Sequence, residues 1–270
     1  MAFSMITSRG VTYLASELLD QVQGVRHGFA TRVGGVSPEP WNTLNLGFKT
    51  DDEEARVHTN WGRFLGALGL AGRPLMHLTQ VHSNRALFVS RTPDSGIVDA
   101  GEGDALYTNQ PGFALATVAA DCVPVLVAAG APAKAVAAIH AGWRGIAAGI
   151  VVNTIQRLAS VAGMDLSHRE FTVAVGPHIK SCCFEVGPEV VDRFHEALQL
   201  EPSDLRPGER DRCYLDLQAV LIRQLASCGV HPDRVDVVRH CTRCRPDLFF
   251  SYRRDGPCCG MLGAAVCLES

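Results

Sequence analysis

The most evident shortage in this chain of 270 residues is lysine, which occurs only at Lys49, Lys134 and Lys180. Arginine supplies the other 22 of the 25 basic residues, and 28 acidic residues bring the formal net charge to -3. A weakly acidic chain does not attract polyanions as a whole, so we expect no nucleic-acid partner. The arginine excess suits local, bidentate contacts with phosphate.

Long apolar runs are also missing. The longest, residues 113–130, is broken by Asp121 and Pro124, so no segment of the sequence is expected to span a bilayer. Residues 1–20 lack the basic start and apolar block of a secretory signal. We therefore expect a cytoplasmic protein with no membrane partner, whose ten cysteines are mostly reduced thiols.

What the chain does contain is typical of a globular enzyme, with 47% hydrophobic and 20% charged residues. Neither a repeat nor a linker divides it, so residues 1–270 are predicted to form a single domain. Strands intermixed with helices predict an α+β fold. Helices are predicted at residues 51–68, 146–161, 188–198 and 215–228. Strands are predicted at 74–89 (two, around a loop), 123–129, 135–139, 171–175, 235–238 and 261–268, and a polar loop at 204–212.

One predicted hairpin organises the chain. Apolar runs at 123–129 and 135–139 flank a Gly-Ala-Pro turn, and Cys122 and His140 each lie nine residues from Ala131. An antiparallel pairing centred on Ala131 places Cys122 directly opposite His140, with Cβ atoms roughly 4.5–5.5 Å apart. A thiol and an imidazole at one point suit a metal ion or a Cys/His catalytic pair. The plain alternative is a buried cysteine and a structural histidine.

A catalytic zinc ion commonly has three protein ligands and an open position, so a third ligand is needed. His82 is our candidate, because it lies in a polar loop between two strands. Anion contacts are predicted at Arg144, just before a helix, and at the Gly34-Gly35 turn beside Arg32. A simple surface turn is the alternative for the latter.

The sequence spacing of cysteine, histidine and glutamate residues suggests two other zinc sites. Cys241 and Cys244, with Cys258 and Cys259 downstream, suggest a structural cluster, but one CxxC without a clean second pair is a weak signal. His168-Arg-Glu170 matches the first half of a zinc deaminase motif. The second half fails, because a histidine and not a proline precedes Cys241.

A set of motifs resembles the laccase-domain family, bacterial proteins labelled polyphenol oxidases and later described as purine nucleoside phosphorylases. The resemblance covers nearly the whole chain. The motifs are Phe29-Ala-Thr-Arg-Val-Gly-Gly-Val-Ser37, Asn45-Leu-Gly47, Gln80-Val-His-Ser83, Gly103-Asp-Ala105, Ala120-Asp-Cys-Val-Pro-Val-Leu126, His140-Ala-Gly-Trp-Arg-Gly145, Gly176-Pro177, Phe184-Glu-Val-Gly187 and Phe250-Ser-Tyr-Arg-Arg-Asp-Gly256.

The resemblance implies a mixed β-sandwich core flanked by helices, and a metal site of His82, Cys122 and His140 that holds zinc, with copper as the other candidate. It implies phosphorolysis of adenosine, inosine, guanosine and S-methyl-5′-thioadenosine, with adenosine deamination besides. On this hypothesis Asp121 or Glu185 handles protons. Arg32, Gly34, Gly35, Asn45 and Arg144 bind substrate or phosphate. We expect a monomer or a weak homodimer.

Three other functions stay open: a metal-free hydrolase or deamidase with Cys122 as nucleophile and His140 as base, a copper-dependent phenol oxidase, and a non-catalytic nucleotide- or metal-binding module. The chain also departs from the family at Asn60-Trp61, where relatives usually have Asn-Arg. A substrate-contacting arginine is then missing, and Arg63 or Arg56 is the expected substitute.

Overall fold

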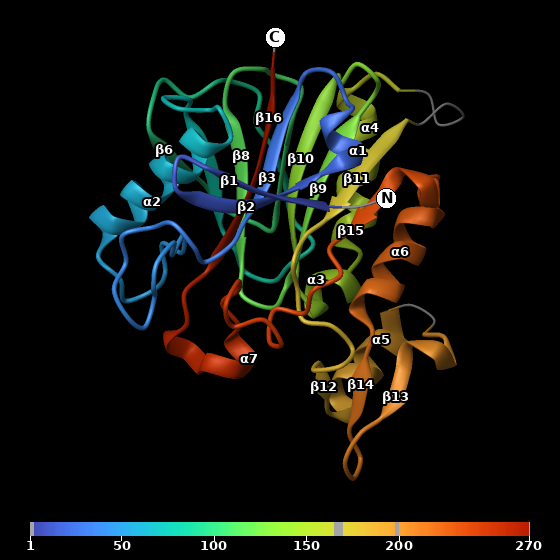
Figure 1. Ribbon diagram of the computed structural model, residues 1–270. Helices are drawn as coiled ribbons and strands as arrows, with labels where there is room; N and C mark the ends of the chain where they lie inside the picture. The colour runs from blue at the N-terminus through green and yellow to red at the C-terminus, as the bar shows by residue number, and fades with distance from the viewer. Residues whose placement is uncertain (1–2, 165–169, 198–199, 270) are drawn as a thin grey trace.

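Two β-sheets face each other across an apolar core, and helices cover their outer faces (Figure 1). This computed structural model describes residues 3–164, 170–197 and 200–269. The α+β fold with a mixed sandwich core and flanking helices is therefore confirmed. Among the described residues, no helix is both long and apolar enough to cross a membrane.

The first sheet has seven strands. Most neighbours are antiparallel, but β4 runs parallel to both β6 and β8. In spatial order they are β1 (Phe3–Ser8), β2 (Val11–Ser16), β3 (Val25–Ala30), β16 (Leu262–Leu268), β8 (Ala114–Ala119), β4 (Leu75–Thr79) and β6 (Ile97–Glu102).

The second sheet has six strands, with the predicted hairpin at its centre. In order they are β15 (Val235–Val237), β11 (Phe171–Val175), β9 (Val123–Ala129), β10 (Ala135–Ala141), β7 (Ala105–Thr108) and β5 (Ala86–Phe88). A small third sheet lies beside it, formed by β12 (Glu185–Val186), β14 (Cys213–Leu215) and β13 (Leu205–Pro207).

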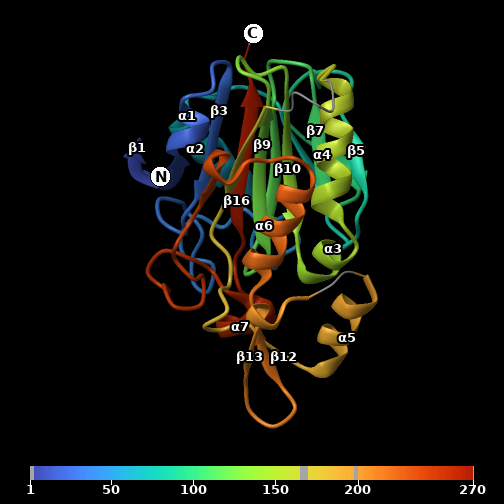
Figure 2. The ribbon, with the colours of Figure 1, turned by 90° about the vertical axis from the view of Figure 1, so that its right-hand side faces the viewer.

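The helices follow the apolar faces of the sheets. Helix α2 packs Trp61 and Phe64 on the outer face of the first sheet, whereas α4 and α6 cover the second (Figure 2). The helices are α1 (Glu17–Asp20), α2 (Glu54–Ala67), α3 (Trp143–Ala147), α4 (Ile150–Val161), α5 (Pro188–Ala197), α6 (Leu217–Ser227) and α7 (Tyr252–Asp255). Short 3₁₀ turns lie at Pro202–Asp204, Pro232–Arg234 and Gly256–Cys258.

Strand β9 shows why its sequence is apolar throughout. Val125 and Val127 point to the α4 and α6 layer, while Leu126 and Ala128 point to the core between the sheets. Successive side chains of a strand face opposite sides, so a strand covered on both sides needs no polar positions.

The predicted centre of the hairpin is wrong by one residue, so the partner of each residue differs by two positions from the prediction. His140 pairs with Pro124 and Ala141 with Val123, so the pairing centres on Pro132 and not on Ala131. The turn occupies five residues between Ala129 and Ala135, which moves the centre. Continuing this register sets Gly142, and not His140, opposite Cys122.

Several predicted boundaries also change. The helix expected at 146–161 is two helices, because Gly149 takes a left-handed conformation (φ 78°) that ends α3 before α4 begins. Residues 204–212 include β13 and are not entirely loop. Of the predictions, Leu198 and the His168 motif fall outside the described residues.

Candidate metal centre and its cavity

Three predicted metal ligands meet at the end of the sandwich from which α3 and α7 project (Figure 1). His82 follows β4, Cys122 directly precedes β9, and His140 is the second-to-last residue of β10. Strands β4 and β8 are parallel and end together, and the chain then crosses to the second sheet through Asp121 (φ 89°). The topology thus gathers three segments that are distant in sequence.

The ligand atoms of His82, Cys122 and His140 all lie within 4.8 Å of one another. Cys122 Sγ is 3.8 Å from His82 Nε2, and the two imidazole rings are nearly perpendicular, with centroids 4.9 Å apart. His140 is buried, whereas His82 is exposed. Two imidazole nitrogens and one thiolate are a donor set that zinc accepts with a fourth position left open.

Asp104 supports this centre, and our sequence analysis did not identify it as a site residue. Its buried carboxylate accepts hydrogen bonds from His140 Nδ1 (2.9 Å), the backbone N–H of His82 (3.0 Å) and the backbone N–H of Ser83 (2.6 Å). The first bond fixes the His140 tautomer and leaves Nε2 for a metal. In the sequence, the only indication of a role for Asp104 is that it is an acidic residue in a Gly-rich loop before a strand.

The pKa values of Cys122, His140 and Asp104 depend on one another. Burial raises the pKa of Cys122, but the charge of His140 and hydrogen bonds from both histidines outweigh it and lower that pKa to about 6. Burial lowers the pKa of His140, yet the Cys122 thiolate and Asp104 raise it to about 9. Hydrogen bonds from His140 and Ser83 lower the pKa of Asp104 to about 2 against the effect of burial. Without metal, the pair is a thiolate and an imidazolium at neutral pH.

Gly142 makes room for the cluster. A Cβ atom at this position would lie 2.8 Å from His82 Cδ2 and 3.1 Å from Cys122 Sγ. Its φ of -68° is accessible to any residue, so the requirement for glycine is steric and concerns only these two ligands.

The centre opens into a cavity of about 840 Å³. Its walls carry aromatic and apolar side chains, which are Phe48, Trp143, Phe184, Tyr252 and Met261. The Phe48 ring stacks on His77, with centroids 4.3 Å apart and planes 21° from parallel. A cavity of this size with a few polar groups is typical of a small-molecule site.

Of the predicted anion contacts, Arg144 is the one that lines this cavity. Its guanidinium stacks on Trp143 at 4.3 Å, and within the described part of the chain no group accepts a hydrogen bond from it. Arg253 lines the cavity as well and donates one hydrogen bond to the Glu185 carbonyl oxygen. Free guanidinium donors at an open cavity suit an anionic substrate.

The other predicted substrate contacts lie elsewhere. The guanidinium of Arg32 donates to the Asn42 carbonyl and side-chain oxygens and to the Pro246 carbonyl. The N–H groups of Gly34 and Gly35 both donate to the Thr43 hydroxyl. Asn45 is buried, and its amide donates to Thr50 and Asp52. The structure does not bring these four residues to the cavity, and their substrate-binding role stays a prediction.

The two predicted proton-transfer residues differ in position. Asp121 lines the cavity, but its carboxylate accepts hydrogen bonds from the Thr242 hydroxyl (2.5 Å), the Ser251 hydroxyl (3.0 Å) and the Arg253 backbone N–H (2.7 Å). Glu185 forms an ion pair with Arg212 (3.6 Å) and is not among the residues that line the cavity. Three donors on Asp121 favour a carboxylate that holds the β8–β9 turn. A proton-transfer role for either residue stays a prediction.

Trp61, where the family resemblance leads us to expect arginine, is buried in α2 and donates its Nε1 proton to the Leu46 carbonyl. Arg63 bonds the Gly34 carbonyl, and Arg56 pairs with Glu53, so neither lines the cavity. The arginine and lysine side chains that line the described cavity are Arg144, Arg253 and Lys49 instead.

The comparisons with known proteins identify the family of this chain. Residues 26–269 match the family described as multi-copper polyphenol oxidoreductase laccase. The chain belongs to this family. Its resemblance to the laccase-domain proteins is thereby confirmed.

Relatives in the family carry a common name. A Mycobacterium tuberculosis protein named purine nucleoside phosphorylase is 35% identical over 245 residues, which are 91% of this chain and 92% of the relative. Purine nucleoside phosphorylase YfiH of Escherichia coli is 34% identical over 235 residues, 87% of this chain and 90% of that protein.

Solved structures share the whole fold. Bacillus licheniformis hypothetical protein YfiH superposes with a TM-score of 0.87 at 28% identity, and YlmD from Geobacillus stearothermophilus with 0.86 at 30% identity. Each match covers 99% of both chains. The family is thus an enzyme family by the names of its members.

Proposed function

We propose that this chain is a zinc-dependent purine nucleoside phosphorylase. Its substrates are adenosine, inosine, guanosine and S-methyl-5′-thioadenosine, which phosphate cleaves to the free base and the sugar 1-phosphate. The observation that carries the proposal is the opening of the His82, Cys122 and His140 donors into a cavity lined by Arg144 and Arg253. The names of its relatives point to the same activity.

The donors fit one zinc ion. His82 and His140 supply imidazole nitrogens, Cys122 supplies a thiolate, and Asp104 orients His140. Such an ion supplies Lewis-acid polarisation of a substrate atom when it is bound. Three donors fit a single ion better than a multicopper set, so we propose zinc and not a copper-dependent phenol oxidase.

Arg144 and Arg253 are the proposed phosphate contacts, because charged donors hold an anion most strongly where water is partly excluded. The aromatic walls, with Phe48 stacked on His77, are the proposed position of the purine. A phosphate oxygen then forms a bond to C1′ while the C1′–N9 bond breaks. The electron pair of that bond stays on N9, and the departing base takes up the proton that the attacking hydrogen phosphate gives up.

We also propose adenosine deamination as a side activity, in which water replaces the exocyclic amine and ammonia leaves. The proposed setting is a cytoplasmic monomer or weak homodimer.

The test is release of base from adenosine and inosine with and without phosphate, with the sugar product identified by ³¹P NMR. We expect ribose 1-phosphate and strict dependence on phosphate. Equal formation of free ribose without phosphate would leave a nucleoside hydrolase. Inosine and ammonia as the sole products of adenosine would leave a deaminase.

A second candidate rests on the Cys122 thiolate beside the His140 imidazolium, the charge pair of a metal-free cysteine hydrolase or deamidase. Chelation separates the two candidates. Loss of turnover on complete metal removal, with recovery on adding zinc, supports the phosphorylase. Full activity in metal-free protein would favour the hydrolase.

A further inference from the structure

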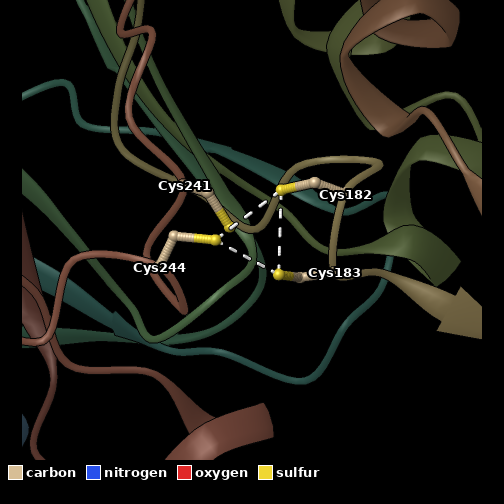
Figure 3. Close-up of side chains that lie close together, drawn as sticks. All are labelled: Cys182, Cys183, Cys241 and Cys244. Carbon is tan, nitrogen blue, oxygen red and sulfur yellow. Dashed lines mark hydrogen bonds between the residues drawn. The ribbon is translucent and has the colours of Figure 1, made fainter.

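Four cysteines form a second cluster (Figure 3). It is separate from the candidate metal centre of His82, Cys122 and His140, which we call the cavity centre. Cys182 and Cys183 follow β11, and Cys241 and Cys244 follow β15. These strands are parallel neighbours, so both segments leave the same end of the sheet. The CxxC pair at 241–244 does lie in a cysteine cluster, but the other two sulfurs come from about 60 residues upstream and not from Cys258 and Cys259, the pair considered from the sequence.

The sulfur positions approximate a tetrahedron. All four Sγ atoms lie within 4.8 Å of one another. Three of the separations are 3.7 Å (Cys182–Cys183), 3.8 Å (Cys182–Cys244) and 3.4 Å (Cys183–Cys244). A zinc ion with Zn–S bonds of about 2.3 Å requires sulfur–sulfur edges of about 3.8 Å. A disulfide bond would explain why two of the sulfurs are close together. It would not explain why the other two sulfurs lie close to them as well.

The surroundings suit bound thiolates. The backbone N–H of Lys180 donates to Cys241 Sγ (3.4 Å), and the Arg243 guanidinium donates to Cys183 Sγ (3.7 Å). Four thiolates around a divalent ion leave two negative charges, which these donors partly offset.

We propose that Cys182, Cys183, Cys241 and Cys244 bind a zinc ion that is structural and independent of the cavity centre. Four protein donors fill the tetrahedral shell and leave no open position for a substrate. Tetrahedral sulfur donors select zinc among the common redox-inert ions.

The ion would connect the segment of Cys182 and Cys183 to the segment of Cys241 and Cys244. Both segments support the cavity. Phe184, next to Cys183, lines the cavity wall. Thr242, next to Cys241, donates to Asp121 at the turn that carries Cys122. The four-cysteine site thus fixes loops on which the substrate walls depend, without touching substrate itself.

Zinc content per chain tests the proposal and separates it from the proposed function. We expect about two zinc ions in the unaltered chain, and about one each in His82→Ala/Cys122→Ala and in Cys183→Ser/Cys244→Ser. The Cys258→Ser variant, which alters an exposed cysteine outside the cluster, should keep the full content. If only the cavity proposal fails, the His82→Ala/Cys122→Ala variant still holds one ion per chain.

Because a serine variant of the cluster can misfold, the decisive measurements use chains with all four thiols. Zinc X-ray absorption of the His82→Ala/Cys122→Ala variant should show four sulfurs at about 2.3 Å. In that variant, exposed Cys182 and Cys244 should resist alkylation until zinc is chelated, whereas exposed Cys258 should react throughout. Chelation should also lower its melting temperature, because metal binding is coupled to folding.

Any of four results would overturn the proposal. These are the absence of zinc from the His82→Ala/Cys122→Ala variant, a disulfide among the four cysteines, alkylation of Cys182 and Cys244 at the rate of Cys258 before chelation, and a coordination shell with nitrogen.

Discussion

His140 donates its Nδ1 proton to Asp104 Oδ1 over 2.9 Å, and both side chains are buried. Because the same carboxylate accepts the backbone N–H groups of His82 and Ser83, one residue orients two of the three candidate ligands. The positions of His82 and His140 at the metal centre therefore depend on Asp104, which would not itself bind the metal.

Replacing Asp104 by asparagine should weaken zinc binding about 10–100-fold, because the orienting charge on His140 is lost. The folded-state pKa of Asp104 lies at about 2, below its ordinary value, so its stabilisation is present above about pH 4 and disappears as pH falls toward 2. The variant should lose about 2 kcal/mol of unfolding free energy at neutral pH, with a smaller difference in acid. Urea unfolding at several pH values measures this. Asp233→Asn, an exposed carboxylate, is the control, and equal losses in both variants would contradict the prediction.

Zinc binding at the cavity centre, measured in the Cys183→Ser/Cys244→Ser variant, should release about one proton between pH 7 and 8, because the His140 pKa of about 9 makes its imidazole charged in the metal-free protein, whereas a ligand must be neutral. The Cys122 thiol, with a pKa of about 6, is already ionised in this range. The apparent affinity should then rise by up to about tenfold per pH unit. Calorimetry in buffers of different ionisation enthalpy counts the proton, and a count of zero at pH 8 would refute the prediction.

Replacing Gly142 by alanine should abolish or strongly weaken zinc binding, because the new methyl group would press on His82 and Cys122. Gly62 in α2 has open space around its missing Cβ, so Gly62→Ala is the matched control and should bind zinc normally. Titration of both metal-free variants with zinc measures the two affinities that the prediction compares. Normal affinity in Gly142→Ala would show that the ligands need not approach as described.

Cys122→Ala should lose zinc from the cavity centre and lose turnover, while the fold persists, because one small side chain rarely decides folding. Circular dichroism checks the fold, and zinc analysis with phosphorolysis checks the site. Cys258→Ala, at an exposed position, should behave like the unaltered protein. Retention of full turnover in Cys122→Ala would remove this thiol from the mechanism.

Arg144→Ala should raise the phosphate KM, or lower kcat/KM for phosphate, by about tenfold or more, since one charge-assisted contact contributes about 1.5–3 kcal/mol. The nucleoside KM should change less. Arg193→Ala removes an exposed arginine of α5 that pairs with Glu196, and serves as the control. Unchanged phosphate kinetics in Arg144→Ala would place the anion elsewhere in the cavity.

The hairpin shows how far local sequence reasoning extends. Apolar runs around a breaker were sufficient to predict β9, β10 and the meeting of Cys122 with His140. The register was not predictable, because it depends on the length of the turn. The two side chains still meet because the register moves by two residues, which keeps Cys122 and His140 on the same face of the sheet as diagonal neighbours.

Contacts between distant segments were beyond sequence reasoning. Asp104 reaches His140 only because β7 and β10 are antiparallel neighbours. Arg32 and the Gly34-Gly35 turn have the composition of an anion site, but Asn42 and Thr43 take up their donors. In both cases the tertiary neighbours, which the local pattern does not specify, decide the chemistry.

The position of the cavity centre has a mechanical consequence. His82 extends from β4 of one sheet and His140 belongs to β10 of the other, so a shared ion is a cross-link between the two layers. It acts at one end only, since the far end of β9 and β10 is closed by a turn within a single sheet. A bound ion would therefore resist separation of the two layers at the cavity end, in addition to the apolar packing between the sheets.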